Sequence, residues 1–153
     1  MTAKLLLTTL LPLVADLARD LPESERYRRL LHALRTLLPC DAAALLRLDG
    51  AWLVPLAVDG LSLDTLGRRF KVSEHPRFEF LLSSPGPTRF PSNCELPDPY
   101  DGLVEGLGEH MEVHDCMGCP LFVDEQPWGL LTLDALDSKR FEPIELEDLQ
   151  AFA

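Results

Sequence analysis

The chain has 153 residues with 46% hydrophobic side chains, and its 14 basic against 25 acidic residues give a formal net charge of −11. This length and composition predict one globular domain with a core of its own, and argue against a disordered or fibrous protein. The negative charge repels phosphate groups, which argues against direct contact with nucleic acid or an anionic membrane.

Four cysteines are too few and too unevenly placed for a disulfide-stapled secreted domain. We therefore expect a reducing cytoplasm, in which thiols bind metals or react. The apolar start is a poor signal peptide, because Pro12 interrupts it and Asp16 stands where small residues should flank a cleavage site. No apolar run is long enough to span a bilayer.

Two helices are predicted at the beginning of the chain. Thr8 or Thr9 would cap the first helix, with Pro12 in its opening turn. Ser24 would open the second, in which apolar residues recur every three or four positions and form one stripe. Pro39 would end it.

A β-hairpin follows, because β-forming runs at 42–48 and 51–58 flank Asp49-Gly50, a strong hairpin turn signal. Shorter elements come next. In chain order they are a helix over 61–66, a strand over 67–72, a helix beginning at His75-Pro76-Arg77 and reaching Leu82, and a strand over 88–90.

The segment 91–110 is the least regular part, and long loops in compact domains are often functional. Residues 141–153 predict an amphipathic helix without a terminating Gly or Pro, as expected of a fragment whose last helix continues towards further domains. The fold expected for the single domain 1–153 is α+β, with one central antiparallel sheet and helices packed on it.

A second hairpin is predicted from β-rich runs at 113–123 and 128–136 around a polar break. If the turn is centred near Glu125, opposed residue numbers add up to about 250, and Cys116 lies opposite Asp134. Opposed Cβ atoms are ~4.5–5.5 Å apart, so the thiol and the carboxylate could share a metal ion. A one-residue slip would remove this pairing. Alternatively, Cys116 packs as a small hydrophobe and Asp134 ends a strand.

Asp98 and Asp101 form a second candidate for metal binding. Pro97 and Pro99 fix the backbone on either side of Asp98, so the loop loses little entropy when it presents two carboxylates to a divalent cation. The alternative is that Asp-Pro and Asp-Gly are ordinary turn chemistry here.

Three other side chains are candidates near this site. Cys116 and Cys119 match a CxxC pattern, but residues three apart in a strand point to opposite faces, so only a bulge at Gly118 would join the thiols.

His114 lies on the same strand face as Cys116, where it could be a further ligand or a structural hydrogen-bonder. Arg77 would offset excess negative charge in a cluster of carboxylates and one thiolate. The common nucleotide-binding and hydrolase motifs are absent from the sequence.

Several motifs are shared with a known family. The runs at 120–122 and 129–134, with Phe141 and the final helix, are similar to the closing half of GAF domains. More specific are GLSLDTLGRRF (60–70), HPR (75–77), RFP (89–91), ELPDPYDGL (95–103) and VHDCMGCPLF (113–122). Together they resemble the amino-terminal GAF domain of the NorR family of nitric-oxide-responsive transcription activators.

The resemblance implies a sensor rather than an enzyme. It implies a mononuclear non-haem Fe(II) that binds nitric oxide, with ligands at Asp98, Asp101, Cys116 and Asp134 and with Arg77 on or near the metal. Since a guanidinium has no lone pair to give, we expect Arg77 beside the metal. The resemblance also implies a sigma-54-dependent activator that contains an AAA+ ATPase domain and a helix-turn-helix domain. In that activator this domain would restrain the ATPase domain.

Two alternatives stay open at this point. Free methionine-R-sulfoxide reductases also have a GAF fold, and Cys94, Cys116 and Cys119 could serve there as nucleophile and resolving thiols. A GAF domain without metal could instead bind an organic ligand or act as a dimerisation module. A homodimer formed through the helices is compatible with each of these functions.

Overall fold

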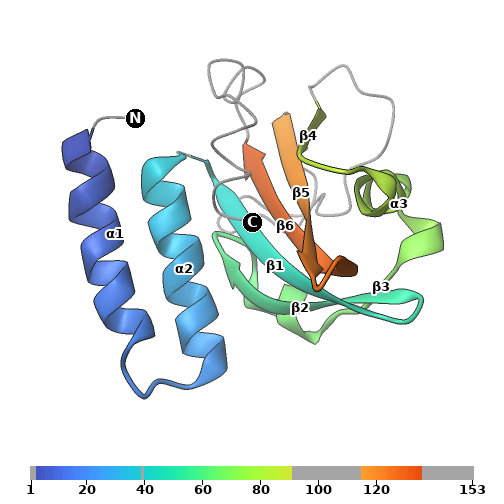
Figure 1. Cartoon of the computed structure of the whole chain (residues 1–153). Helices are drawn as coiled ribbons and strands as arrows, with labels where there is room; N and C mark the ends of the chain where they lie inside the picture. Colours follow the sequence, from blue (N-terminus) through green and yellow to red (C-terminus); the bar gives the residue numbers. More distant parts are fainter. Residues whose placement is uncertain (1–2, 39, 91–114, 136–153) are drawn as a thin grey trace.

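Two hairpins and one short strand on either side build a single antiparallel sheet (Figure 1). The computed structural model describes residues 3–38, 40–90 and 115–135. In chain order the elements are α1 (Ala3–Leu17), α2 (Glu23–Leu37), β1 (Ala42–Asp49), β2 (Trp52–Asp59), the 3-10 turn η1 (Leu63–Gly67), β3 (Phe70–Lys71), the 3-10 turn η2 (Val72–Glu74), α3 (Pro76–Ser83), β4 (Thr88–Phe90), β5 (Asp115–Val123) and β6 (Gln126–Ala135). The strand order is β3-β2-β1-β6-β5-β4. The predicted α+β class is confirmed.

The first hairpin turns where the sequence predicts it. Asp49 pairs with Trp52, and Gly50 between them has a φ of 61°, a conformation that glycine adopts without steric cost. The predicted short elements at 75–82 and 88–90 correspond to α3 and β4. The strand expected over 67–72 is shorter, because only Phe70 and Lys71 pair with β2.

The second hairpin reaches the expected register by an unexpected route. Its turn consists of Asp124 and Glu125, both with positive φ, as in a two-residue type I′ turn. Continued without interruption, that turn would place Cys116 opposite Leu133. A register shift after Leu121 makes Trp128 an extra residue in β6, and beyond this bulge Cys116 pairs with Asp134, as predicted.

The two hairpins join along β1 and β6. Ala42 pairs with Asp134 and Arg47 with Gly129 in an antiparallel ladder. The strands approach so closely that a Cβ at Gly129 would overlap the carbonyl oxygen of Leu46. The central strands are therefore fixed relative to one another by backbone contacts.

The sheet separates two apolar clusters. On one face α2 contributes Leu31 and Leu34, which pack with Met117 and Leu133 of the central strands. On the other face α3 contributes Phe78 and Leu81. We call these the α2 face and the α3 face. Because side chains alternate along a strand, β5 and β6 contribute to both clusters.

The predicted start of the first helix is wrong. The helix α1 begins at Ala3, since leucine favours helix and extends it upstream of the threonines. Thr8 does not cap it, and its hydroxyl donates to the Lys4 carbonyl oxygen at 2.9 Å. Pro12 therefore lies inside the helix, where it cannot donate a backbone hydrogen bond.

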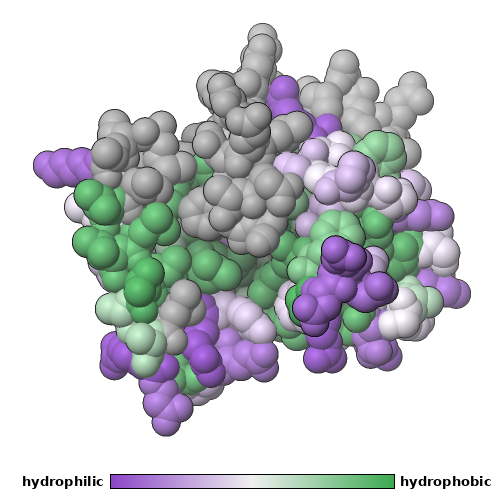
Figure 2. All heavy atoms as spheres, viewed as in Figure 1, coloured by the Kyte–Doolittle hydropathy of each residue, from purple (hydrophilic) through white to green (hydrophobic). Residues whose placement is uncertain are grey.

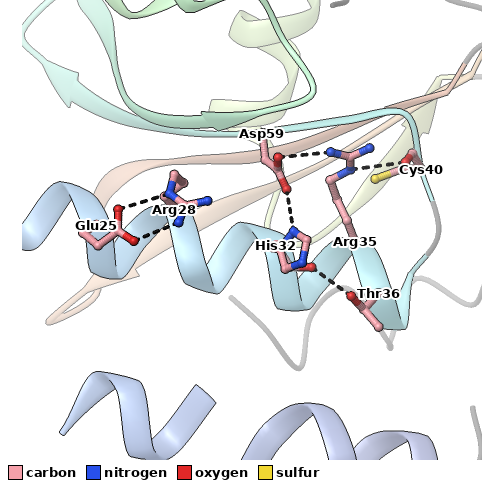
Figure 3. Close-up of polar contacts among 7 residues, drawn as sticks. All are labelled: Glu25, Arg28, His32, Arg35, Thr36, Cys40 and Asp59. Atoms are coloured by element: carbon pink, nitrogen blue, oxygen red, sulfur yellow. Dashed lines mark hydrogen bonds and ion pairs between the residues drawn. The ribbon is translucent and has the colours of Figure 1, made fainter. Parts of the chain in front are cut away.

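The helix α2 begins one residue before the expected Ser24, with Pro22 in the capping position. Its last turn is tied to the sheet by polar contacts (Figure 3). Arg35 Nη1 lies 3.2 Å from Asp59 Oδ1 at the end of β2, and Arg35 Nε donates to the Cys40 carbonyl oxygen at 3.3 Å. His32 Nδ1 lies 3.4 Å from the other oxygen of Asp59. These contacts fix α2 against the entry to β1.

The helix α1 carries exposed apolar residues, Leu7, Leu11 and Val14. The surface over α1, at the left of Figure 2, is largely hydrophobic. None of the described helices combines the length and hydropathy needed to cross a membrane. The segment predicted as irregular, 91–110, and the helix predicted over 141–153 lie outside the described residues.

Candidate metal centre

A row of four opposed residues crosses the sheet at the end where β6 finishes. From β4 to β1 it consists of Phe90, Cys116, Asp134 and Ala42. Directly opposed residues lie on the same face, and Phe90, Cys116 and Ala42 belong to the cluster under α3. Cys116 and Asp134 are only 3% and 1% exposed. A thiol and a carboxylate thus lie side by side in the protein interior.

The helix α3 brings a positive charge to the same face. Arg77 is buried in the first turn of this helix, with 6% exposure. Its Cζ lies 5.1 Å from the centroid of the Phe90 ring, within the range of a cation–π contact. Because Phe90 is the direct neighbour of Cys116, the ring places the guanidinium on the side of the sheet that carries the thiol and the carboxylate.

Small residues make room for α3 beside this row. The next opposed set across the same strands is Thr88, Gly118, Thr132 and Ala44. A Cβ at Gly118 would overlap the side chain of Leu81 on α3. The absence of a side chain at Gly118 therefore sets how closely α3, and Arg77 with it, approaches the sheet.

The two thiols of the CxxC match do not meet. The β5–β6 ladder is regular from Cys116 to Cys119, with its register shift further along, after Leu121. Cys116 consequently belongs to the cluster under α3 and Cys119 to the cluster under α2. The expectation that the two thiols point to opposite faces is confirmed, and no bulge at Gly118 joins them.

Burial keeps two other thiols neutral at physiological pH. It raises the pKa of Cys119 to about 11 and is the main cause of a Cys40 pKa of about 12. For Cys40 the Arg35 guanidinium opposes the increase, and the Asp134 carboxylate adds to it. Since thiolates and not thiols bind metals, neither side chain offers a ready ligand.

Not every predicted ligand can be placed. Asp98, Asp101 and His114, together with Cys94, lie outside the described residues. Within residues 3–38, 40–90 and 115–135, no group of three or more His, Cys, Asp or Glu side chains gathers as a metal site. This part of the chain contributes two donors, Cys116 and Asp134, and the compensating charge of Arg77.

These donors fit a first-row divalent metal. A carboxylate with one thiolate combines a hard and a soft ligand, as Fe(II) accepts, and both carboxylate oxygens of Asp134 are buried. A buried carboxylate is costly to ionise unless a positive charge lies close to it. A metal ion together with Arg77 would meet that requirement.

Sequence reasoning missed Phe90 and the ion pair between Arg89 and Asp115. Phe90 lies in the RFP motif, and its neighbour Arg89 donates to both carboxylate oxygens of Asp115. The pair joins residues far apart in the sequence, so no local periodicity could reveal it. Only the β4–β5 register shows that Phe90 is the sheet neighbour of Cys116 and that Arg89 lies close to Asp115.

Comparisons with known proteins agree with this architecture. Residues 22–153 match the GAF domain family. The GAF domain of an Acinetobacter phosphoenolpyruvate-protein phosphotransferase superposes with a TM-score of 0.74, over 99% of this chain and 89% of that one. Its identity of 13% supports a common fold alone.

Two relatives have higher sequence identity. Over 139 residues, 90% of the chain, it is 53% identical to the nitric oxide reductase transcription regulator NorR2 of Cupriavidus necator. Over 93% of the chain it is 45% identical to the anaerobic nitric oxide reductase transcription regulator NorR of Serratia proteamaculans. The chain spans 27% and 28% of the lengths of these proteins. Both are named as transcription regulators, in agreement with the prediction that the domain is not an enzyme.

Proposed function

The chain belongs to the GAF domain family, and we propose that it is the nitric-oxide-sensing domain of a NorR-type transcription regulator. In this proposal the domain binds nitric oxide at one mononuclear non-haem Fe(II). It then changes its contact with an AAA+ ATPase domain of the parent protein. A ligand shifts such a contact only by its different affinity for the two states of the protein.

The observation that carries the proposal is the pairing of Cys116 with Asp134 on the α3 face. Both side chains are buried, and Arg77 lies on the same face over Phe90. A thiolate raises electron density at a metal and so favours binding of nitric oxide. The metal would supply an open coordination position for the diatomic ligand.

The proposed ligand set is Asp98, Asp101, Cys116 and Asp134. The four negative charges of these ligands exceed the two positive charges of Fe(II). The guanidinium of Arg77 balances part of the excess. His114, two residues before Cys116, is a further candidate ligand. A homodimer, a cytoplasmic location and the lack of direct contact with nucleic acid stay predictions.

The alternative of a thiol enzyme finds less support in the geometry. Cys116 and Cys119 belong to clusters on opposite faces of the sheet, so they cannot form a pair of attacking and resolving thiols in this fold. A metal-free domain that binds an organic ligand would give no stoichiometric iron signal in electron paramagnetic resonance, which distinguishes it from the proposed sensor.

The test is electron paramagnetic resonance of the anaerobic protein loaded with Fe(II) and exposed to nitric oxide. We expect a half-integer-spin iron signal at one iron per chain. Cys116→Ala and Asp134→Asn should each abolish it, and the control Cys119→Ala should retain it because that side chain lies on the α2 face.

Substoichiometric iron, or an unchanged signal in both ligand variants, would contradict the ligand assignment. The output is tested in the full-length parent protein, in which nitric oxide should raise the ATPase activity of the wild type and leave the Cys116→Ala variant unchanged. A parent protein whose ATPase ignores nitric oxide while its iron signal is intact would refute the control function.

A further inference from the structure

A partly buried ion pair lies directly behind the candidate metal centre. Arg89 of β4 donates from Nε to Asp115 Oδ1 and from Nη2 to Asp115 Oδ2, both at 3.0 Å. The Asp115 side chain has no exposed surface, and that of Arg89 is 27% exposed. Two parallel charge-assisted hydrogen bonds fix the relative orientation of the two side chains.

The ion pair lies on the opposite side of the sheet from the metal ligand. Arg89 directly precedes Phe90, and Asp115 directly precedes Cys116. Because adjacent residues of a strand point to opposite faces, the two charged groups lie behind the Phe90 and Cys116 side chains. The pair is diagonal across the ladder, since Arg89 is opposite Met117 and not opposite Asp115.

The strand β4 has few backbone contacts with the rest of the described sheet. Its described ladder with β5 consists of three pairs, Thr88 with Gly118, Arg89 with Met117 and Phe90 with Cys116. It is also the last strand in the order of the described sheet, so β5 is its only partner among the described strands. Few backbone hydrogen bonds therefore hold β4 in the described sheet, and Phe90 is its final residue.

Phe90 connects this ion pair to the site. Its ring packs beneath the Arg77 guanidinium at 5.1 Å and is the sheet neighbour of Cys116. A shift of β4 would therefore move the aromatic surface on which Arg77 lies. The Cys116–Asp134 pair would not shift with it, because β1 and β6 fix Asp134 independently.

We propose that Arg89 and Asp115 are positioning residues for the metal centre: their ion pair holds Phe90 beside Cys116 and so keeps Arg77 over the site. Neither residue contacts the metal. The part of this inference that concerns iron rests on the function proposed above. The part that concerns Arg77 is a property of the domain alone.

Energetics give a reason to separate positioning from stability. Well-packed apolar residues often replace a buried ion pair without loss of stability, whereas removal of one partner leaves a buried charge behind. The double variant Arg89→Met/Asp115→Leu removes both charges together. It should fold, but it lacks the fixed geometry of the two hydrogen bonds.

The first measurement needs no metal. In the wild-type domain the ring current of Phe90 should shift the nuclear magnetic resonance of Arg77 Nε–H, and Phe90→Leu should abolish that shift. In the folded double variant the Arg77 resonance should move towards its Phe90→Leu position. Arg69 is an internal control, because its Cζ lies at the same 5.1 Å from the Trp52 ring, far from β4 in the sheet order.

The second measurement is anaerobic Fe(II) affinity by chelator competition. Loss of groups that hydrogen-bond to metal ligands typically lowers affinity ~10–100-fold. Because Arg77 and not a ligand is displaced here, we expect the lower end, about tenfold, in the double variant. Arg89→Lys keeps the positive charge but cannot donate two parallel hydrogen bonds. Its Fe(II) affinity should lie between those of the wild type and the double variant. The control Asp64→Asn removes the exposed ion pair between Asp64 of η1 and Arg68, which directly follows η1, and should leave the Fe(II) affinity unchanged.

An Arg77 resonance identical in the wild type and the folded double variant would overturn the inference. Wild-type Fe(II) affinity in that variant would overturn it as well. If the wild-type domain itself binds no Fe(II), the proposed function fails. In that event the Arg77 resonance alone decides whether the ion pair positions the guanidinium.

Discussion

The two faces of the central sheet are built from the same strands and have different chemistry. On the α2 face Met117 and Leu133 lie opposite one another within an aliphatic core. One residue away, on the α3 face, Cys116 lies opposite Asp134 beneath a buried arginine. At these four positions the strands β5 and β6 supply packing on one face and candidate ligands on the other, because the pleat directs neighbouring residues to opposite sides.

This comparison shows how strongly the site depends on register. A slip of β6 by one residue would pair Cys116 with Leu133 under α3 and would turn Asp134 to the α2 face. The bulge at Trp128 prevents that arrangement, because it corrects the register that the two-residue turn would otherwise impose. A local irregularity near the hairpin tip therefore determines chemistry at the far end of the strands.

The largest expected effect comes from exchanging the chemistry of the two faces. Leu133→Asp places a carboxylate in the aliphatic core and should cost about 5 kcal/mol or more, from lost packing and the buried charge. Asp134→Asn, one residue further, exchanges a buried carboxylate for a neutral amide of the same shape, so it should change the stability of the metal-free domain far less, by about 1–2 kcal/mol. Urea unfolding of both variants measures this difference. Equal destabilisation would show that the two faces are not chemically distinct.

A smaller loss is expected from a change that affects both faces at once. Gly129→Ala introduces a Cβ against the backbone of Leu46 and should push β6 away from β1 at a cost of about 3 kcal/mol. Gly67→Ala is the matched control, since nothing lies within 4 Å of the added atom. Thermal unfolding should separate the two variants, and similar midpoints would contradict the close approach of the strands.

A third substitution affects the α3 face alone. Gly118→Ala meets the flexible side chain of Leu81 and should cost about 1–3 kcal/mol while α3 moves outward. Hydrogen exchange should accelerate in α3 and remain unchanged in α2. Faster exchange in α2 as well would mean that the two faces are mechanically coupled.

The effect that is smallest at neutral pH, and that develops only in alkali, concerns the buried thiols that belong to the α2 face or lie close to it. Burial holds the folded-state pKa of Cys119 near 11 and that of Cys40 near 12, above the ordinary value of 9.0. Unfolded thiols release protons first, so stability should be unaffected below pH 9 and should fall as pH rises through the interval from 9 to 12. Urea midpoints of wild type and Cys119→Ala test this. The variant should lose less stability over that interval, and parallel curves would contradict the assignment.

Much of the fold follows from local sequence signals. Asp49-Gly50 fixed the first hairpin, and the Pro76 helix and the strand at 88–90 agree closely with the structure. The start of α1 was mispredicted because the leucines extend the helix past Thr8, whose hydroxyl bonds within it.

The candidate site was predictable to a lesser degree. The opposition of Cys116 and Asp134 came from counting residues around the turn, and it holds because the bulge at Trp128 offsets the error in the turn centre. The contacts of Arg77 with Phe90, and of Arg89 with Asp115, join separate elements and leave no periodic trace in the sequence. Only the strand order supplies them.

Co(II), a spectroscopic substitute for Fe(II), tests most directly whether one face of the β5–β6 hairpin is a metal centre. We expect a sulfur-to-metal charge-transfer band that saturates at one cobalt per chain. The band should disappear in Cys116→Ser and persist in Cys119→Ser. In Asp134→Asn the Co(II) affinity measured from the band should fall at least about tenfold. A band that survives in Cys116→Ser, or that is lost in Cys119→Ser, would contradict the proposed metal centre.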